Sequence, residues 1–386
     1  MTELNIPAPI WISDDESLVK ACDEWKSSAY ISLDTEFIRT TTFYPQPGLF
    51  QLATDRACWL LDPLSITDWA PFNELMVCPE IIKVFHACLE DLEVCRQLLG
   101  VLPTPLFDTQ MGLAYIGEGG SVGFQRAVAG ILDIDIPKGA TRTNWLQRPL
   151  TEHQVEYATA DVYYLHQLYP KILARLEALG RLSWLQEDCA RVIELASAVS
   201  DDYSQAYQRV KLGWKLRPQE QYVLQQLSIW REIEARERDV PRNKIADDPT
   251  LWNMCRFKAR NRDQLQKAGL RAQVLRDQGK VILRIIADAL DAPASEWPTQ
   301  LERPLHIEAA DRQKKMKKLV VKHAEKLDIP PELLANKRIL DVLIRSEGSV
   351  IPEALSGWRM AEIGRPLIDW LSAGDVNENL SVDVDE

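Results

Sequence analysis

The sequence predicts an α/β domain in the first half of the chain and all-α domains in the second half. In the first half, segments that alternate apolar and polar residues, as strands do, are interspersed with segments of helical periodicity. This order is typical of a sheet with helices packed around it. After about Asp201 the strand signals fade and the sequence becomes helical and charged. A length of 386 residues exceeds the usual size of one hydrophobic core, so we expect two or three domains.

The predicted elements of the first half follow in chain order. The strands cover Tyr30–Phe37, Leu49–Thr54, Ala57–Asp62 and Ile82–Phe85, and the helices cover Asp14–Ser27, Leu89–Leu99, Gly123–Leu132 and Thr151–Ala178. Because helical segments flank or separate these strands, we expect the sheet to be covered by helices.

The first predicted strand carries two acidic residues, Asp34 and Glu36. Residues two apart on a strand project from the same face, so both side chains point the same way. Two neighbouring carboxylates repel each other unless a cation lies between them, and hard divalent ions such as Mg²⁺ prefer carboxylate oxygens. For an isolated Asp-x-Glu, an exposed strand with two surface acids is the more common explanation.

Three further residues are candidates for the same chemistry. Tyr157 and Asp161 are spaced i, i+4 on the last predicted helix of this half, so a phenol can stand beside a carboxylate. A half-buried tyrosine with an acid on its exposed flank would give the same pattern. Asp91 lies near the start of the helix predicted from Leu89, where an aspartate is often only a cap.

The second half is predicted to contain two helical regions joined by a linker. In the first region, one helix opens at Pro218 and another begins at Asp248. The linker covers Ala292–Pro298. The second region has helical segments at Asp311–Leu327, Pro331–Leu333, Lys337–Arg345 and Trp358–Leu371.

Composition excludes several classes of protein. An apolar content of 46% with 26% charged residues is typical of a soluble globular protein. No apolar run approaches the roughly 20 residues of a membrane span, and the N-terminus has no basic region followed by an apolar stretch, so we expect a cytoplasmic protein. The seven cysteines lack a Cys-x-x-Cys pair, and the five histidines lack zinc-site spacing. The net charge of −12 does not exclude RNA binding, because the local distribution of charge matters more than the sum.

The order of the acidic motifs resembles the tyrosine-bearing branch of the DEDD superfamily of 3′→5′ exonucleases, and most closely the ribonuclease D family. The resemblance runs from about Tyr30 to about Leu185. It includes the segments Asp34-Thr35-Glu36-Phe37, Phe107-Asp108-Thr109-Gln110, Val122-Gly123-Phe124-Gln125 and Trp145-Leu146-Gln147-Arg148-Pro149-Leu150. The chain departs from the family at Thr143-Asn144, where Ser-Asp is usual before the tryptophan, and this leaves the four carboxylates intact.

The resemblance implies a ribonuclease H-like exonuclease domain over residues 1–200. The segments Trp230-Arg231-Glu232 and Val240-Pro241-Arg242 resemble a helicase-and-ribonuclease-D C-terminal (HRDC) domain, which we place at residues 214–292. The region 300–372 is similar to a second, more diverged HRDC domain. An acidic tail over residues 373–386 is expected to be disordered.

Catalytic roles are also implied by the resemblance. Asp34, Glu36, Asp91 and Asp161 would bind two divalent ions, Mg²⁺ or Mn²⁺, and Tyr157 would orient the attacking water. In such sites two ions about 3.5–4 Å apart flank the scissile phosphate. The expected reaction is hydrolysis from RNA 3′ ends with release of 5′-mononucleotides. Structured RNA, above all tRNA precursors in 3′ maturation, is the substrate that the family suggests.

Candidate RNA contacts are aromatic or basic, apart from the amide of Gln125. Exonucleases often stack terminal bases on aromatic rings, and basic side chains bind phosphates. Packing in the core or on a solvated helix face explains such residues equally well. The candidates are Phe37, Phe50, Phe124, Gln125, Arg148, Lys258, Arg260, Lys314, Lys315, Lys317 and Lys318.

Two other functions remain open at this point. A DNA 3′→5′ exonuclease of the proofreading or Werner type would carry the same acidic motifs, and recognition of a 2′-hydroxyl cannot be inferred from sequence. A catalytically silent RNA-binding scaffold would be expected to have lost at least one of the four carboxylates or the tyrosine, and all five are present. The sequence indicates no protein partner.

Overall fold

The computed structural model describes residues 6–137, 139, 143–198 and 202–373, so the predicted acidic tail lies, apart from Ala373, outside the described residues. The chain divides into two compact units. The first comprises Met1–Ile38, Pro47–Ser197 and Leu305–Glu386. The second comprises Arg39–Gln46 and Ala198–Pro304.

The first unit is built on a six-stranded mixed sheet with strand order β1-β4-β3-β2-β5-β6. The strands are β1 (Ile10–Ile12), β2 (Tyr30–Ile38), β3 (Gln46–Ala53), β4 (Cys58–Leu61), β5 (Ile82–Phe85) and β6 (Leu106–Asp108). β2, β5 and β6 run parallel, as do β1 and β4, whereas β3 and β4 are antiparallel. The central position of β2 places its residues under helices of both faces.

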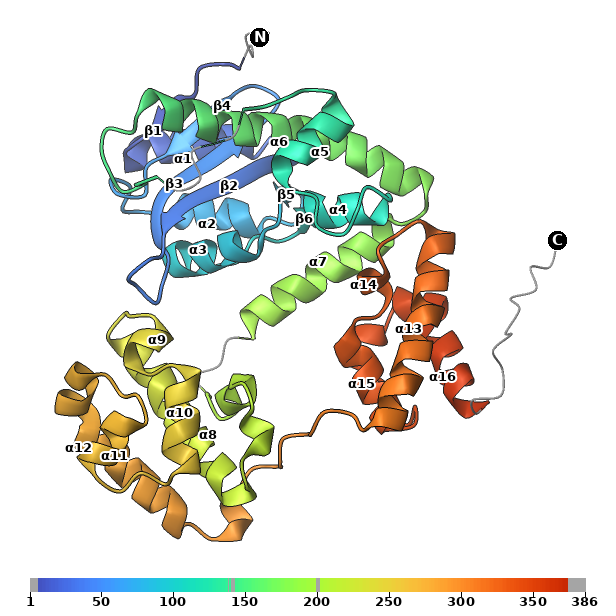
Figure 1. Cartoon of the computed structure of the whole chain (residues 1–386). Helices are drawn as coiled ribbons and strands as arrows, with labels where there is room; N and C mark the ends of the chain where they lie inside the picture. The colour runs from blue at the N-terminus through green and yellow to red at the C-terminus, as the bar shows by residue number, and fades with distance from the viewer. Residues whose placement is uncertain (1–5, 138, 140–142, 199–201, 374–386) are drawn as a thin grey trace. The chain divides into compact units, whose positions relative to one another are not determined.

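Among the described residues before Ala198, seven helices belong to this unit. They are α1 (Asp15–Trp25), α2 (Ala70–Val77), α3 (Leu89–Leu99), α4 (Thr109–Tyr115), α5 (Phe124–Leu132), α6 (Glu152–Ala178) and α7 (Leu182–Ser197). α6 packs across β2, β4 and β5, and Figure 1 shows it running along the sheet. Its start is fixed by a capping box, in which the Thr151 hydroxyl accepts from the N–H of Gln154 and the Gln154 side chain accepts from the N–H of Thr151.

Alternation along the strands separates two apolar layers. Trp59 and Leu61 of β4 join the main core, where the ring of Trp59 packs edge-on against Trp25 of α1 with centroids 5.4 Å apart. Leu60, between them, points the other way and packs with Ala158 of α6. The sheet is therefore buried on both faces, as expected for an α/β domain.

The predicted α/β class is confirmed, together with all four predicted strands and all four predicted helices of the first half. Sequence reasoning did not predict the three-residue strands β1 and β6, the short helices α2 and α4, or the longer helix α7. The two strands and the two short helices are too short to develop a measurable periodicity.

The second unit is helical and contains the HRDC region. Its elements are η1 (Ala206–Arg209), η2 (Gly213–Lys215), α8 (Pro218–Glu237), α9 (Arg242–Ile245), α10 (Asp248–Arg256), α11 (Arg262–Lys267), α12 (Ala272–Asp291) and η3 (Ala294–Glu296). Helices α8 and α12 pack together at the centre. The loop Arg39–Gln46 belongs to this unit, because Phe43 is buried in its core and the N–H groups of Phe43 and Tyr44 donate to Asp239.

The C-terminal helical region folds into the first unit. It comprises α13 (Ile307–Leu327), α14 (Pro331–Leu334), α15 (Lys337–Arg345), η4 (Glu353–Leu355), η5 (Met360–Gly364) and α16 (Arg365–Ser372). The Trp358 ring stacks on Trp184 of α7 with centroids 4.3 Å apart, and Arg359 binds the carboxylate of Asp188. Its assignment as a second HRDC-like domain stays a prediction.

Two further expectations concern the whole chain. None of the helices in the described ranges is long and apolar enough to cross a membrane. All seven cysteines are free thiols.

Candidate active site

Strand β2 and helix α6 bring three carboxylates together. Asp34 and Glu36 point from the same face of β2, as strand geometry requires, toward the helix that carries Asp161. One carboxylate oxygen of each residue lies within 4.8 Å of the other two. This spacing allows a single cation to contact all three groups.

Asp91 approaches from the other side of β2. It is the third residue of α3, and its Oδ1 accepts a hydrogen bond of 2.5 Å from the hydroxyl of Thr35. Thr35 lies between Asp34 and Glu36, so its side chain leaves the opposite face of the strand. Asp91 is outside the group of three, yet its charge acts on Glu36. Sequence reasoning did not identify Thr35 as the residue that holds Asp91.

The carboxylates are difficult to ionise together. Burial, followed by repulsion from Asp34, Asp161 and Asp91, raises the pKa of Glu36 to about 10. Burial raises the pKa of Asp161 to about 7. The hydrogen bond from the Tyr157 hydroxyl lowers this pKa and so opposes the effect of burial. Burial and the charge of a neighbouring acid raise the pKa values of Asp34 and Asp91 well above the ordinary range. The cluster therefore has a strong need for positive charge.

No lysine or arginine in the described ranges forms an ion pair with Asp34, Glu36, Asp91 or Asp161. The donors are all carboxylate oxygens, which are the ligands that Mg²⁺ and Mn²⁺ prefer. Buried charges in proteins are paired or coordinate metals. The residues present therefore fit a divalent-ion site.

Tyr157 lies one helical turn before Asp161, as its i, i+4 spacing predicts, and is half-buried. Burial and the charges of Asp161, Asp34 and Glu36 raise the pKa of its phenol, so it keeps its proton at neutral pH. Gly139 passes so close to the tyrosine ring that a Cβ there would lie 1.8 Å from Cε2. Only glycine fits at that position while the ring keeps its place.

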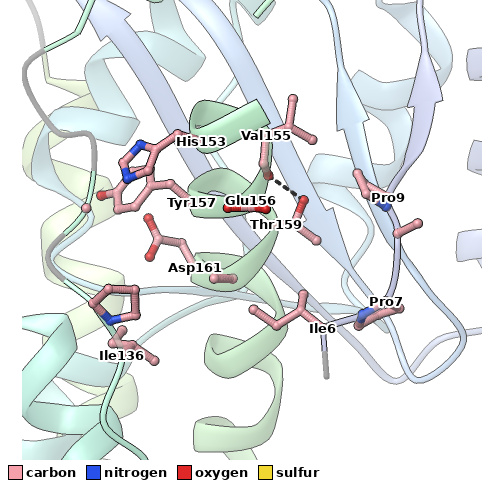
Figure 2. Close-up of a pocket in the computed structure, with 14 residues that line it drawn as sticks. Ile6, Pro7, Pro9, Ile136, His153, Val155, Glu156, Tyr157, Thr159 and Asp161 are labelled. Atoms are coloured by element: carbon pink, nitrogen blue, oxygen red, sulfur yellow. Dashed lines mark hydrogen bonds between the residues drawn. The ribbon is translucent and has the colours of Figure 1, made fainter. Parts of the chain in front are cut away.

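A cavity of about 610 Å³ opens beside these residues. Tyr157, Asp161, His153 and Glu156 of α6 line it, together with Ile136 and with the segment Ile6–Pro9. Figure 2 shows Asp161 and Tyr157 on the side of α6 that faces Ile136, whereas Ile6 and Pro7 lie toward the opposite side. The cavity is large enough to admit part of a nucleotide chain beside Asp161, the one carboxylate of the cluster in its described lining.

Two predicted RNA contacts are wrong in the folded protein. Phe50 has no exposed surface, because it lies on a central strand and packs edge-on against Phe72 with centroids 5.9 Å apart. Arg148 uses all five of its N–H groups inside the protein, two on Asp62 at 2.6 and 2.8 Å and the others on backbone carbonyls. Arg148 therefore forms a structural ion pair with Asp62 and has no N–H group left for a phosphate.

The remaining candidates keep some exposure. Phe37 and Phe124 are half-buried, and the exposed Gln125 donates to the carbonyl of Ile136 at 2.6 Å. In the HRDC unit, Arg260 is exposed and Lys258 is half-buried, with its Nζ donating to Gln219. The exposed lysines of α13 are Lys314, Lys315, Lys317 and Lys318. Contact of these residues with RNA stays a prediction.

Comparison with known proteins agrees with this fold. A family model described as 3′-5′ exonuclease matches residues 9–177, and an HRDC domain model matches residues 220–286. The HRDC domain expected in the second half is thus confirmed.

Full-length relatives are similar to almost the whole chain. Ribonuclease D of Pseudomonas paraeruginosa is 44% identical over 368 residues, which cover 94% of this chain and 97% of that protein. The crystal structure of Escherichia coli RNase D, described as an exoribonuclease involved in structured RNA processing, aligns with a TM-score of 0.89 at 34% identity and covers 95% of this chain and 99% of that one. The chain therefore belongs to the ribonuclease D family of 3′→5′ exoribonucleases.

Proposed function

We propose that this protein trims structured RNA, with tRNA precursors as the main substrate, from the 3′ end and releases 5′-mononucleotides. The observation that carries the proposal is the cluster of Asp34, Glu36 and Asp161, whose carboxylates lie within 4.8 Å of one another without a basic partner among the described residues. Such an arrangement is costly for folding and is expected where an ion must bind.

Four carboxylates would hold two divalent ions. Asp34 and Glu36 of β2 and Asp161 of α6 would share one position, and Asp91 of α3 would complete the other. When bound, such ions lower the pKa of a coordinated water and stabilise the negative charge on a leaving oxygen. The hydrogen bond from Thr35 keeps Asp91 turned toward the strand.

Tyr157 would orient the attacking water. Its raised pKa keeps the phenol protonated, so it acts as a hydrogen-bonding group and not as a general base that must lose its own proton. Its bond to Asp161 ties the phenol to the carboxylate cluster, and Gly139 leaves room for the ring.

Structured RNA as the substrate is supported by the E. coli relative, which is described as acting in structured RNA processing. The exposed lysines Lys314, Lys317 and Lys318 of α13 provide positive charge on a chain whose net charge is −12. Phosphate contacts of this kind hold RNA without recognising its sequence.

The test is a time course on a 3′-extended tRNA with the wild type and with Asp34→Ala, each in Mg²⁺, in Mn²⁺ and in EDTA. Progressive shortening from the 3′ end, release of 5′-mononucleotides and loss of both in EDTA and in the variant are expected. A matched single-stranded DNA distinguishes the two nucleic acids.

Other outcomes would overturn the proposal in different ways. Shortening of DNA alone would make the protein a DNA exonuclease. Binding of RNA without any shortening in either metal would make it a silent binding protein. Shortening at the same rate on structured and unstructured RNA would remove the proposed preference for structured substrates.

A further inference from the structure

The turn that precedes α3 adopts an unusual backbone conformation. After β5 ends at Phe85, the chain passes through His86, Ala87 and Cys88 before α3 begins at Leu89. Ala87 has φ of 62°, in the left-handed region that residues with a Cβ rarely adopt. Strained residues of this kind persist only where surrounding contacts enforce them, and they cluster at functional sites.

The carboxylate of Asp108 supplies those contacts. Asp108 ends the neighbouring strand β6, directly opposite Phe85 in the register of the parallel pair. Its Oδ1 accepts from the N–H of Ala87 at 3.1 Å, and its Oδ2 accepts from the N–H of Cys88 at 2.9 Å. The bonds are sheltered from water, since only 3% of Asp108 is exposed.

The same carboxylate also caps α4. Oδ1 accepts from the N–H groups of Gln110 at 2.8 Å and Met111 at 3.3 Å. Three of these four N–H groups share Oδ1 and the fourth binds Oδ2, so the carboxylate serves the backbone of two segments. It is also outside the group of three carboxylates that could share a cation.

The turn determines where Asp91 stands. Asp91 is three residues after Cys88, within the first turn of α3, so any change at Ala87 moves it with the helix start. At the other end, Asp91 accepts from Thr35 at 2.5 Å, a distance that leaves little freedom for displacement. The helix must therefore begin in one place for Asp91 to meet the carboxylates of β2.

We propose that Asp108 is a positioning residue for the metal site: its bonds to Ala87 and Cys88 hold the left-handed turn and thereby place Asp91. The inference rests on the proposed function, because Asp91 acts there as a metal ligand. Sequence reasoning noted Asp108 as part of a family-like segment and gave it no role.

The experiment measures Mn²⁺ affinity of the full-length chain by calorimetry without RNA, alongside the melting temperature in EDTA. Asp108→Asn keeps the size of the side chain but turns an N–H₂ group toward backbone N–H donors. Its Mn²⁺ affinity is expected to fall about 10- to 100-fold, as for other residues that orient metal ligands. Asp14→Asn makes the same substitution at the cap of α1 and is expected to leave Mn²⁺ affinity unchanged.

Rescue distinguishes positioning from general destabilisation. In the double variant Asp108→Asn, Ala87→Gly, the left-handed turn no longer needs enforcement, because glycine adopts positive φ without steric cost. Recovery of at least about threefold in Mn²⁺ affinity is expected. Ala87→Val, which keeps Asp108 but disfavours positive φ, is expected to weaken Mn²⁺ binding and keeps the test valid if Asp108→Asn does not fold.

The contrary results are separable. If Asp108→Asn and Ala87→Val bind Mn²⁺ as tightly as the wild type while melting earlier, Asp108 has only a structural role. If Asp108→Asn binds weakly but glycine at position 87 gives no recovery, the route through the turn is wrong. If the wild type itself binds no Mn²⁺, the proposed function fails, and the inference fails with it.

Discussion

Two groups of buried carboxylates in this chain differ in their partners. Asp188 receives two N–H groups of Arg359 at 2.5 and 2.6 Å, and Glu232 of the HRDC unit binds both Arg236 and Arg242. In the acidic cluster, Asp91 and Asp161 are buried to a similar degree, with 7% and 9% exposed, and Asp34 and Glu36 are half-buried. In the part of the chain that the structure describes, they meet only other acids and neutral donors.

The pKa values follow the partners. Burial by itself raises the pKa of Glu232. Hydrogen bonds from Arg242 and Arg236 nevertheless hold this pKa below its ordinary value. Burial and like charge raise the pKa of Glu36 to about 10 instead. Paired acids fasten parts of the fold together, whereas unpaired acids leave a demand for positive charge that a bound ion can meet.

The largest effect is expected where the unpaired cluster loses a carboxylate. Asp161→Asn should lower the rate of RNA hydrolysis roughly ten-thousandfold, because metal-ion catalysis contributes several kcal/mol. Its melting temperature in EDTA should rise or stay level, because repulsion among the acids is relieved. Steady-state kinetics measures the rate and calorimetry measures the melting temperature. Glu152→Gln, at the exposed start of α6, is the control. A melting temperature several degrees below that of the wild type would contradict the claim that the unpaired acids repel one another.

In the paired group, removal of the cation should damage the fold. Arg359→Met leaves the carboxylate of Asp188 buried without its partner and should lower the free energy of unfolding by about 3–5 kcal/mol. Urea unfolding measures this loss. Lys20→Met, which breaks an exposed pair with Glu16, should cost no more than about 1 kcal/mol. Equal losses in the two variants would remove the distinction between buried and exposed pairs.

A smaller effect is expected at the tyrosine. Tyr157→Phe removes the hydroxyl and keeps the ring beside Gly139, so kcat should fall by a factor of roughly ten to a thousand. Mn²⁺ affinity should stay within about threefold of the wild type, because the four carboxylates remain. Single-turnover kinetics with saturating metal separates the two quantities. Loss of metal affinity equal to the loss of rate would assign Tyr157 to the metal site itself.

The smallest effect is a pH dependence of stability. In the unfolded chain the acids have pKa values near 4, whereas burial raises that of Asp161 to about 7 in the folded state. The folded protein thus binds more protons between these values, so its stability in EDTA should fall by about 2 kcal/mol or more as the pH rises from 4 through 7. Saturating Mg²⁺ should cancel this trend. A curve in EDTA that is flat over this range would contradict the raised pKa values.

Much of the fold could be predicted from local pattern. Alternation over Tyr30–Phe37 located the central strand and set Asp34 and Glu36 on one face, because side-chain direction in a strand depends on sequence spacing alone. The same pattern cannot tell which face is covered. The sequence therefore leaves Phe50 as a possible contact for RNA, although residues on both faces of β3 are buried.

Contacts between distant segments were beyond local pattern. The partner of Arg148 is Asp62, 86 residues away, and the partner of Asp91 is Thr35, 56 residues away. The place of Asp91 near the cluster was expected from the family resemblance and not from its own surroundings in the sequence. The positive φ of Ala87 leaves no sequence signal, because the contacts that enforce it come from Asp108 on another strand.

The most direct test of metal binding by the acidic cluster is a count of Mn²⁺ ions bound per chain, by electron paramagnetic resonance on the wild type and on Asp34→Asn. Two Mn²⁺ ions, which Mg²⁺ displaces, are expected per wild-type chain, with loss of at least one in the variant. Equal binding by both proteins, or no binding by the wild type, would contradict the claim that the unpaired carboxylates exist to hold metal ions.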